Sequence, residues 1–276
     1  MEDDGRASRE CVVTAKVMID GPPVSSSAGT IDVVDGDAAA QAQLVYDQIN
    51  ARTSACDDFD ETQLEGSRQY FDLASPRLRT RSFDVLTCLV GLQIPSALQS
   101  ALGSRVDEIL SILPQSARVY RVNLPLLHWE SHIVRRPGEP EPPFPLDQVA
   151  DCFAVAVSDS RSFQIAYRGF FVAPDGTIAF QGYGTTDQLR SHLSEAMPFS
   201  SLHQNKTAHI SVARILDPIG PDAFHRLLAM RSASDHDDVL GVLPVREVKL
   251  VSERRWYMED YTILRTAELA AGRDRR

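Results

Sequence analysis

Apolar positions along this chain follow two spacings, and these divide it into strands and helices. A continuous apolar run ends at Pro95, as expected of a buried strand. Ser96 then precedes apolar residues spaced by three and four, as in an amphipathic helix. The same criteria predict helices over 38–51, from 96, from 146, over 186–197 and over 221–230, and strands over 83–94, 119–122, 126–134, 163–172, 177–180, 208–216, 245–251 and 261–266.

The order of these elements predicts an α+β fold. Strands and helices that alternate in this way form two sheet-and-helix lobes, and a cleft between the lobes is expected. The chain has 276 residues, of which 43% are hydrophobic and 24% are charged, so it can bury a substantial core.

Acidic charge is concentrated at the start of the chain. Residues 1–80 contain 15 acidic and 7 basic residues, which is most of the net charge of −10. We interpret residues 1–80 as an acidic, partly flexible N-terminal extension, with 1–28 flexible and 29–80 packed loosely on the remainder. The main domain is expected over 81–270, followed by a flexible tail over 271–276.

Composition also bounds the cellular setting and the partners. No run of 18 apolar residues is present, so no membrane span is expected, and the acidic N-terminus does not have the pattern of a signal peptide. Four scattered cysteines, Cys11, Cys56, Cys88 and Cys152, favour free thiols in a reducing cytoplasm. Strong binding to long nucleic acids is not expected, since it depends on an excess of lysine and arginine.

One predicted strand places a histidine beside a hydroxyl. His209 and Ser211 are two residues apart in a β-branched run, so they project from the same face, while Ile210 and Val212 pack on the other. An imidazole and a hydroxyl on a rigid strand suit acid–base chemistry on a phosphate ester. A buried strand with one satisfied histidine is the simpler alternative.

A second predicted strand carries a similar set. Period-two alternation over 126–134 puts His128, Glu130 and His132 on one face, with Trp129 and Ile133 opposite. The alternative is an edge strand with polar residues on its solvated side. Two such strands together form a candidate site.

The two strands resemble the paired motifs of the two-histidine (2H) phosphoesterase superfamily, LigT-like group, whose motif is His-x-Thr/Ser-x. The second motif matches well, because His209-x-Ser211 is followed by Val212, Ala213 and Arg214. The first departs, because Glu130 stands where the family has a hydroxyl. The order of elements over about 82–269 agrees with the resemblance.

The resemblance implies two pseudo-symmetric αβ lobes with antiparallel sheets around a central cleft. It implies a metal-independent phosphodiesterase without a cofactor, acting on a cyclic phosphodiester or on a nucleotide or RNA terminus. His128 and His209 would be its two catalytic histidines, one acting as the general acid and the other as the general base. Ser211 and Arg214 would contact the phosphate, and Tyr257 could stack on a base.

Glu130 leaves several hypotheses open. It could pair with a histidine and favour the imidazolium, it could carry a proton itself, or its charge could mark a site that has diverged from this chemistry. His132 and Glu130 are therefore alternative catalytic residues. His128, Glu130, His132 and His209 could instead bind zinc in a metal-dependent hydrolase. A non-catalytic binding module on the same fold is the remaining alternative.

Overall fold

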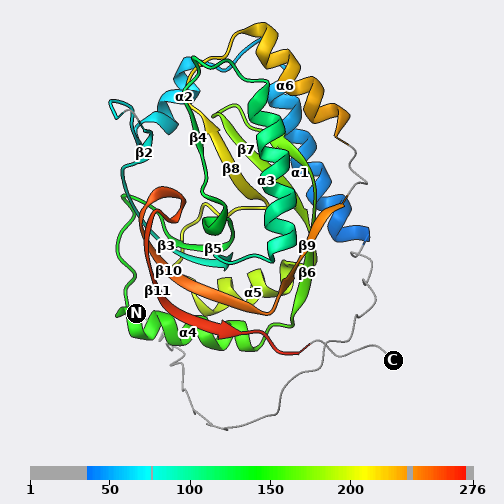
Figure 1. Ribbon diagram of the computed structural model, residues 1–276. Helices are drawn as coiled ribbons and strands as arrows, with labels where there is room; N and C mark the ends of the chain where they lie inside the picture. Colours follow the sequence, from blue (N-terminus) through cyan, green and yellow to red (C-terminus); the bar gives the residue numbers. More distant parts are fainter. Residues whose placement is uncertain (1–35, 76, 235–238, 272–276) are drawn as a thin grey trace, which may run out of the picture. The chain divides into compact units, whose positions relative to one another are not determined.

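The computed structural model describes residues 36–75, 77–234 and 239–271. Two antiparallel sheets dominate the part that it describes (Figure 1). One sheet has the strand order β11-β10-β3-β5 and the other the order β4-β8-β7-β6-β9, while β1 and β2 pair separately. The strands are β1 (Phe71–Asp72), β2 (Arg79–Thr80), β3 (Ser82–Gly91), β4 (Val119–Arg121), β5 (His128–Arg135), β6 (Phe163–Val172), β7 (Thr177–Tyr183), β8 (Ile210–Ile215), β9 (Val239–Val245), β10 (Glu247–Arg255) and β11 (Asp260–Glu268).

Helices cover both sheets. Helix α4 packs on α5 and on β10 and β11, and α5 also contacts β5. On the other sheet, α3 contacts β9, α6 contacts β6, and α1 contacts β6 and β7. The helices are α1 (Gly36–Ser54), α2 (Glu61–Arg68), α3 (Ser96–Ser111), α4 (Leu146–Ser158), α5 (Asp187–Ala196) and α6 (Pro221–Ala233). The predicted α+β class is confirmed, and no helix in the described ranges is long and apolar enough to cross a bilayer.

The strand predicted over 245–251 corresponds to β10, but its bounds were wrong and β9, which precedes it, was missed. The chain completes β9 at Val245 while paired with β6, and at Glu247 it begins β10, which pairs with β3 in the other sheet. Arg246 and Glu247 interrupt the apolar pattern at this point. The interruption does not reveal that the chain changes sheets, because both sheets accept the same alternating side chains.

Helix α1 is packed closely, which corrects the expectation of loose packing for this part of the chain. Tyr46 is fully buried and contacts the rings of Phe171 and Tyr183. Thr53 donates to the carbonyl of Val172 at 2.6 Å. Because the segment is acidic overall, the apolar face of helix α1 was not recognised from the sequence. Residues 1–35 and 272–276 lie outside the described residues, and the domain boundary at residue 80 stays a prediction.

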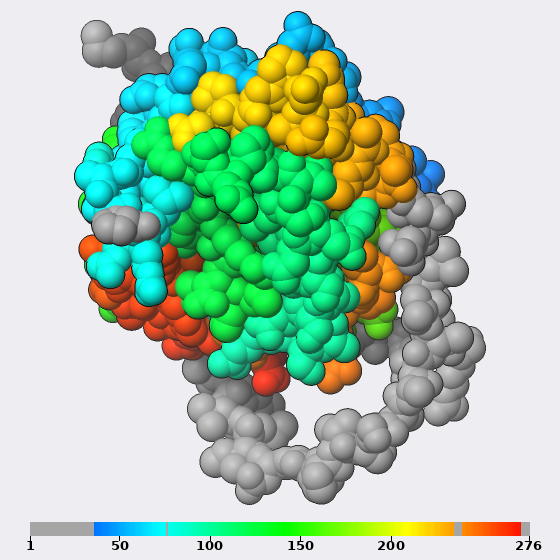
Figure 2. Space-filling view, turned by 45° about the horizontal axis from the view of Figure 1, so that its top comes forward, coloured from blue at the N-terminus to red at the C-terminus, as the bar shows by residue number. Residues whose placement is uncertain are grey.

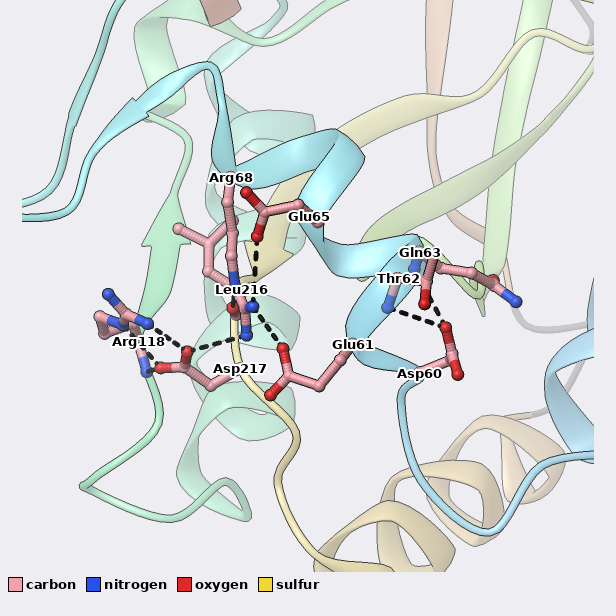
Figure 3. A network of polar contacts seen from close by, with 9 residues as sticks. All are labelled: Asp60, Glu61, Thr62, Gln63, Glu65, Arg68, Arg118, Leu216 and Asp217. Carbon is pink, nitrogen blue, oxygen red and sulfur yellow. Dashed lines mark hydrogen bonds and ion pairs between the residues drawn. The ribbon is translucent and has the colours of Figure 1, made fainter.

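Polar contacts hold α2 against the end of β8 (Figure 3). Asp60 caps the helix by accepting from its first backbone N–H groups. At the other end, Arg68 donates to the carbonyl of Leu216 and to the carboxylate of Asp217. Asp217 also accepts from Arg118 at 2.8 and 2.6 Å, so one carboxylate joins two arginines.

The segment that follows α2 packs on the turn between β10 and β11. Figure 2 shows residues near 70–80, in cyan, against the C-terminal strands, in orange to red. Thr80 donates to Glu259 at 2.7 Å, and the rings of Tyr70 and Phe83 lie 5.0 and 4.9 Å from Trp256. This aromatic contact forms one wall of the pocket described next.

Candidate active site

A pocket of about 590 Å³ is lined by residues of both sheets. β5 contributes His128, Glu130 and Ile133, while β8 and the residue before it contribute His209, Ser211 and Arg214. The remaining lining residues come from α2, from the turns and from the neighbouring strands: Gln63, Gly66, Ser67, Tyr70, Phe83, Val85, Arg136, Pro137, Asp175, Thr177, Asn205, Glu253, Trp256 and Tyr257. The two predicted histidine strands therefore supply side chains to one site.

Both strands carry a β-bulge at the same point. In β5, Glu130 pairs with Leu89 and His132 with the adjacent Cys88, so one extra residue, Ser131, is accommodated. β8 has the same irregularity opposite Ile178 and Ala179. A bulge puts two residues opposite one and shifts the alternation of faces.

The shift gives the two strands matching patterns. The residues of β5 that line the pocket, and those of β8, are spaced by two and then by three: 128, 130, 133 and 209, 211, 214. The same residue spacing and the same bulge occur on strands from two different sheets. This is the local form of the pseudo-symmetry that the sequence resemblance implies.

The bulge places His132 away from the pocket, so the single face expected for His128, Glu130 and His132 is wrong at this position. His132 is 3% exposed, and its Nε2 has no hydrogen-bond partner in the described structure. Burial, with a smaller effect from Arg190, lowers the pKa of His132 to about 4. Ile133, expected on the opposite face, lines the pocket instead.

The hypothesised zinc ligands are consequently not brought together. Within residues 36–75, 77–234 and 239–271, no three His, Cys, Asp or Glu side chains are placed to hold a metal ion. His128, rather than His132, shares the pocket with His209.

Both pocket histidines are held through Nδ1 by the residue two positions earlier. His128 Nδ1 lies 2.7 Å from the carbonyl oxygen of Leu126. A carbonyl can only accept, so this nitrogen carries a proton and donates it. His209 Nδ1 lies 3.1 Å from Oγ1 of Thr207. In each ring, Nε2 is the nitrogen left for a substrate.

The environment of His209 favours its neutral form. Burial is the main cause, and the positive charges of Arg190 and of protonated His128 act in the same direction, so the pKa of His209 falls to about 4. At pH 7 this imidazole is uncharged and can accept a proton.

Arg214 is buried and held by several partners. Its Nε donates to the hydroxyl of Tyr257 at 3.0 Å, and its Nη1 donates to Ser67 and to Asp175 at 2.7 and 2.9 Å. The guanidinium also lies 4.4 Å from the ring centre of Trp256. A positive charge is thereby held in the pocket wall, a few residues from His209.

The ring of Tyr257 is already packed against other rings, whereas the prediction was that it could stack on a base. It is 4% exposed, and its ring stacks on Tyr120 and on Trp256, with centroids 5.2 and 5.0 Å apart. Its hydroxyl accepts from Arg214. The structure therefore gives Tyr257 a supporting role toward Arg214, and its contact with a substrate stays a prediction. Trp256, beside it, is only partly buried.

Sequence reasoning missed Glu253. This residue is 2% exposed, and burial together with the charge of Glu130 raises its pKa well above the ordinary value. It accepts from the backbone N–H of Met258 at 2.9 Å. Tyr257 and Met258 both have φ of 59°, which side-chain-bearing residues rarely adopt, so Glu253 supports a strained turn. The signal in the sequence that could have identified Glu253 was a carboxyl group at a strand position expected to be buried.

Glu130 does not pair with a histidine. Its Oε2 accepts from Asn205 Nδ2 at 3.1 Å, and the described residues show no hydrogen bond or ion pair between Glu130 and His128, His132 or His209. The hypothesis that it orients a histidine through a direct bond is therefore not supported. Its carboxylate faces the pocket as a negative charge.

Replacing Glu130 with glutamine is expected to improve the binding of an anionic substrate. The amide keeps the size and the acceptor oxygen for Asn205 but removes a charge that repels phosphate. We expect KM for a phosphodiester to fall about fivefold at low salt, with a smaller change at high salt. Steady-state kinetics at two ionic strengths measure this effect. Glu195→Gln, on the exposed side of α5, is the matched control, and equal KM values in the two variants would contradict the expectation.

Comparison with known proteins gives structural matches only. No protein-family model matches the chain, and no curated protein is similar to it in sequence. TT0787 of Thermus thermophilus is similar with a TM-score of 0.47 and 17% identity, over 68% of this chain and 98% of that one. E. coli LigT in apo form is similar with a TM-score of 0.44 and 13% identity, over 68% of this chain and 99% of that one. A structure described as a phosphoesterase is similar with a TM-score of 0.44 and 14% identity, over 68% of this chain and 99% of that one.

Proposed function

We propose that this protein is a metal-independent phosphodiesterase that acts on a small cyclic phosphodiester, or on a nucleotide or RNA terminus. One observation supports the proposal most directly. His128 and His209 reach one pocket from two different sheets, and each is held through Nδ1 so that Nε2 remains for the substrate. Two imidazoles at one pocket are the minimum that acid–base catalysis of an in-line displacement at phosphorus needs.

The two histidines take different parts in this mechanism. His209 is neutral at pH 7 because its pKa is lowered to about 4, so its Nε2 accepts the proton of the attacking water. As the water oxygen bonds to phosphorus, the bond to the leaving oxygen breaks. His128, as the imidazolium, donates its Nε2 proton to that oxygen. Arg214 and the hydroxyl of Ser211 stabilise the charge on the non-bridging oxygens.

The size and charge of the pocket suit a small substrate. It is about 590 Å³ and is lined by aromatic, cationic and hydroxyl groups, together with the carboxyl groups of Glu130, Asp175 and Glu253. The chain carries a net charge of −10, which disfavours binding along a long nucleic acid. The proposed setting is the cytoplasm, as the scattered cysteines indicate.

A panel of 2′,3′-cyclic nucleotides, a linear dinucleotide and a phosphomonoester tests the proposal. We expect turnover of one or more diesters, no turnover of the monoester, and equal rates with and without a chelator. Loss of activity in chelator would support a metal-dependent reaction instead. If no diester is turned over but a cyclic nucleotide still shifts the imidazole resonances of His128 and His209, the binding-module alternative holds.

A further inference from the structure

The segment that leads into β8 is bonded to the outer edge of β5. β5 is the last strand of its sheet, so its outer edge is not paired with another strand of that sheet. The side-chain amide of Gln204 bonds to this edge instead. It accepts from the backbone N–H of Ile133 at 2.8 Å and donates to the carbonyl of the same residue at 2.7 Å. The segment that reaches His209 is therefore attached to the strand that carries His128.

A second attachment lies closer to the histidines, at the carbonyl oxygen of Thr207. This oxygen accepts from Trp129 Nε1 at 3.2 Å and from Arg190 Nη2 at 2.9 Å. Trp129 is fully buried and directly follows His128 in β5, while Arg190 belongs to α5. The Arg190 guanidinium lies 5.4 Å from the centre of the Trp129 ring, so the two donors also contact each other. We call these two side chains on one carbonyl the Thr207 clamp.

The position of His209 depends on this clamp, because His209 precedes its strand. β8 begins at Ile210, and its pairing with β7 reaches no further than Phe180. Thr207 also contacts the imidazole directly, since its Oγ1 lies 3.1 Å from His209 Nδ1. A displacement of Thr207 would therefore move the ring of His209.

We infer that the Thr207 clamp sets the spacing between the imidazoles of His128 and His209. Trp129 and Arg190 are positioning residues, since they act through Thr207 and neither lines the pocket. The inference rests on the proposed function and deepens it. A general acid and a general base must both reach one phosphodiester, and a misplacement of about 1 Å can cost on the order of 10²-fold in rate.

The spacing can be measured without any substrate. Crystal structures of the wild type and of Arg190→Met give the distance between Nε2 of His128 and Nε2 of His209. We expect this distance to change in Arg190→Met by more than it differs between independent wild-type crystals. Arg226→Met is the matched control, because Arg226 is an exposed arginine of α6 that also donates to a backbone carbonyl. It is expected to keep the wild-type distance.

Kinetics at pH 7 provide the second readout. Loss of one positioning hydrogen bond is expected to lower kcat about three- to tenfold in Arg190→Met and in Trp129→Phe, with KM unchanged. Arg190→Lys keeps a donor for the Thr207 carbonyl and is expected to recover most of kcat. The lost charge of Arg190 does not confound this measurement, because burial is the main cause of the low pKa of His209 and the ring stays neutral at pH 7.

The double variant Trp129→Phe/Arg190→Met tests whether both residues act through the same carbonyl. If they do, its loss of kcat is smaller than the product of the two single losses. Losses that multiply would overturn the inference, because they would mean that the two side chains act independently. If Trp129→Phe does not fold, the distance in Arg190→Met and the recovery in Arg190→Lys decide the matter.

Two further results would overturn the inference: a wild-type distance between the imidazoles in Arg190→Met, or a kcat in Arg190→Met equal to that of Arg226→Met. Absence of phosphodiesterase activity is a separate outcome. If the distance changes in Arg190→Met but the wild type turns over no diester, the clamp stands and the proposed function fails.

Discussion

Alanine at position 209 is expected to lower kcat on a phosphodiester substrate by about 10²–10⁴-fold, because the reaction loses its general base. The same range is expected for His128→Ala, which removes the acid. KM should change little in either variant, since the imidazoles contribute to proton transfer in the transition state more than to substrate binding. Stopped assays with the best diester of the panel measure both constants.

His132→Gln is the matched control for these two variants. This residue belongs to the same strand as His128, but the bulge at Ser131 places it on the opposite side, away from the pocket. Its kcat should equal that of the wild type. A loss at position 132 as large as that at 128 would mean that the pocket does not carry the chemistry, and it would contradict the assignment of His128.

His132 is instead expected to limit stability in acid. Its pKa is about 4 in the folded chain, against an ordinary value of 6.5. Between these two values the unfolded chain binds a proton that the folded chain does not, so falling pH favours unfolding. Above pH 6.5 the imidazole of His132 is neutral in the folded and in the unfolded chain, so it does not lower the free energy of unfolding. As the pH falls to about 4, this residue removes about 3 kcal/mol from the free energy of unfolding.

Urea unfolding at pH 7 and at about pH 4 measures this contribution. In His132→Leu the decrease in unfolding free energy between the two pH values should be smaller than in wild type by about 3 kcal/mol. His225→Leu, at an exposed position of α6, is the control and should retain the wild-type decrease. Equal decreases in all three proteins would show that His132 is not buried in its neutral form.

The alternating and helical spacings of the sequence were enough to predict most of the elements. The hairpin around Pro174, Asp175 and Gly176 and the helix after Ser96 depend on local turn chemistry and on apolar periodicity, which act over a few residues. His209 and Ser211 were also placed correctly on one face, because the alternation holds between them. Each of these features depends on interactions within a single segment.

Tertiary structure decided the rest through contacts between distant segments. The bulges in β5 and β8 come from pairing with β3 and β7, and the bulge in β5 determines that Ile133, rather than His132, lines the pocket. The raised pKa of Glu253 follows from its burial near Glu130. The hydrogen bonds of Tyr46 with the backbone of Gly182 join residues 136 positions apart in the chain. Pairing register, burial and long-range hydrogen bonds are properties of the folded chain, so no local pattern of residues could have predicted them.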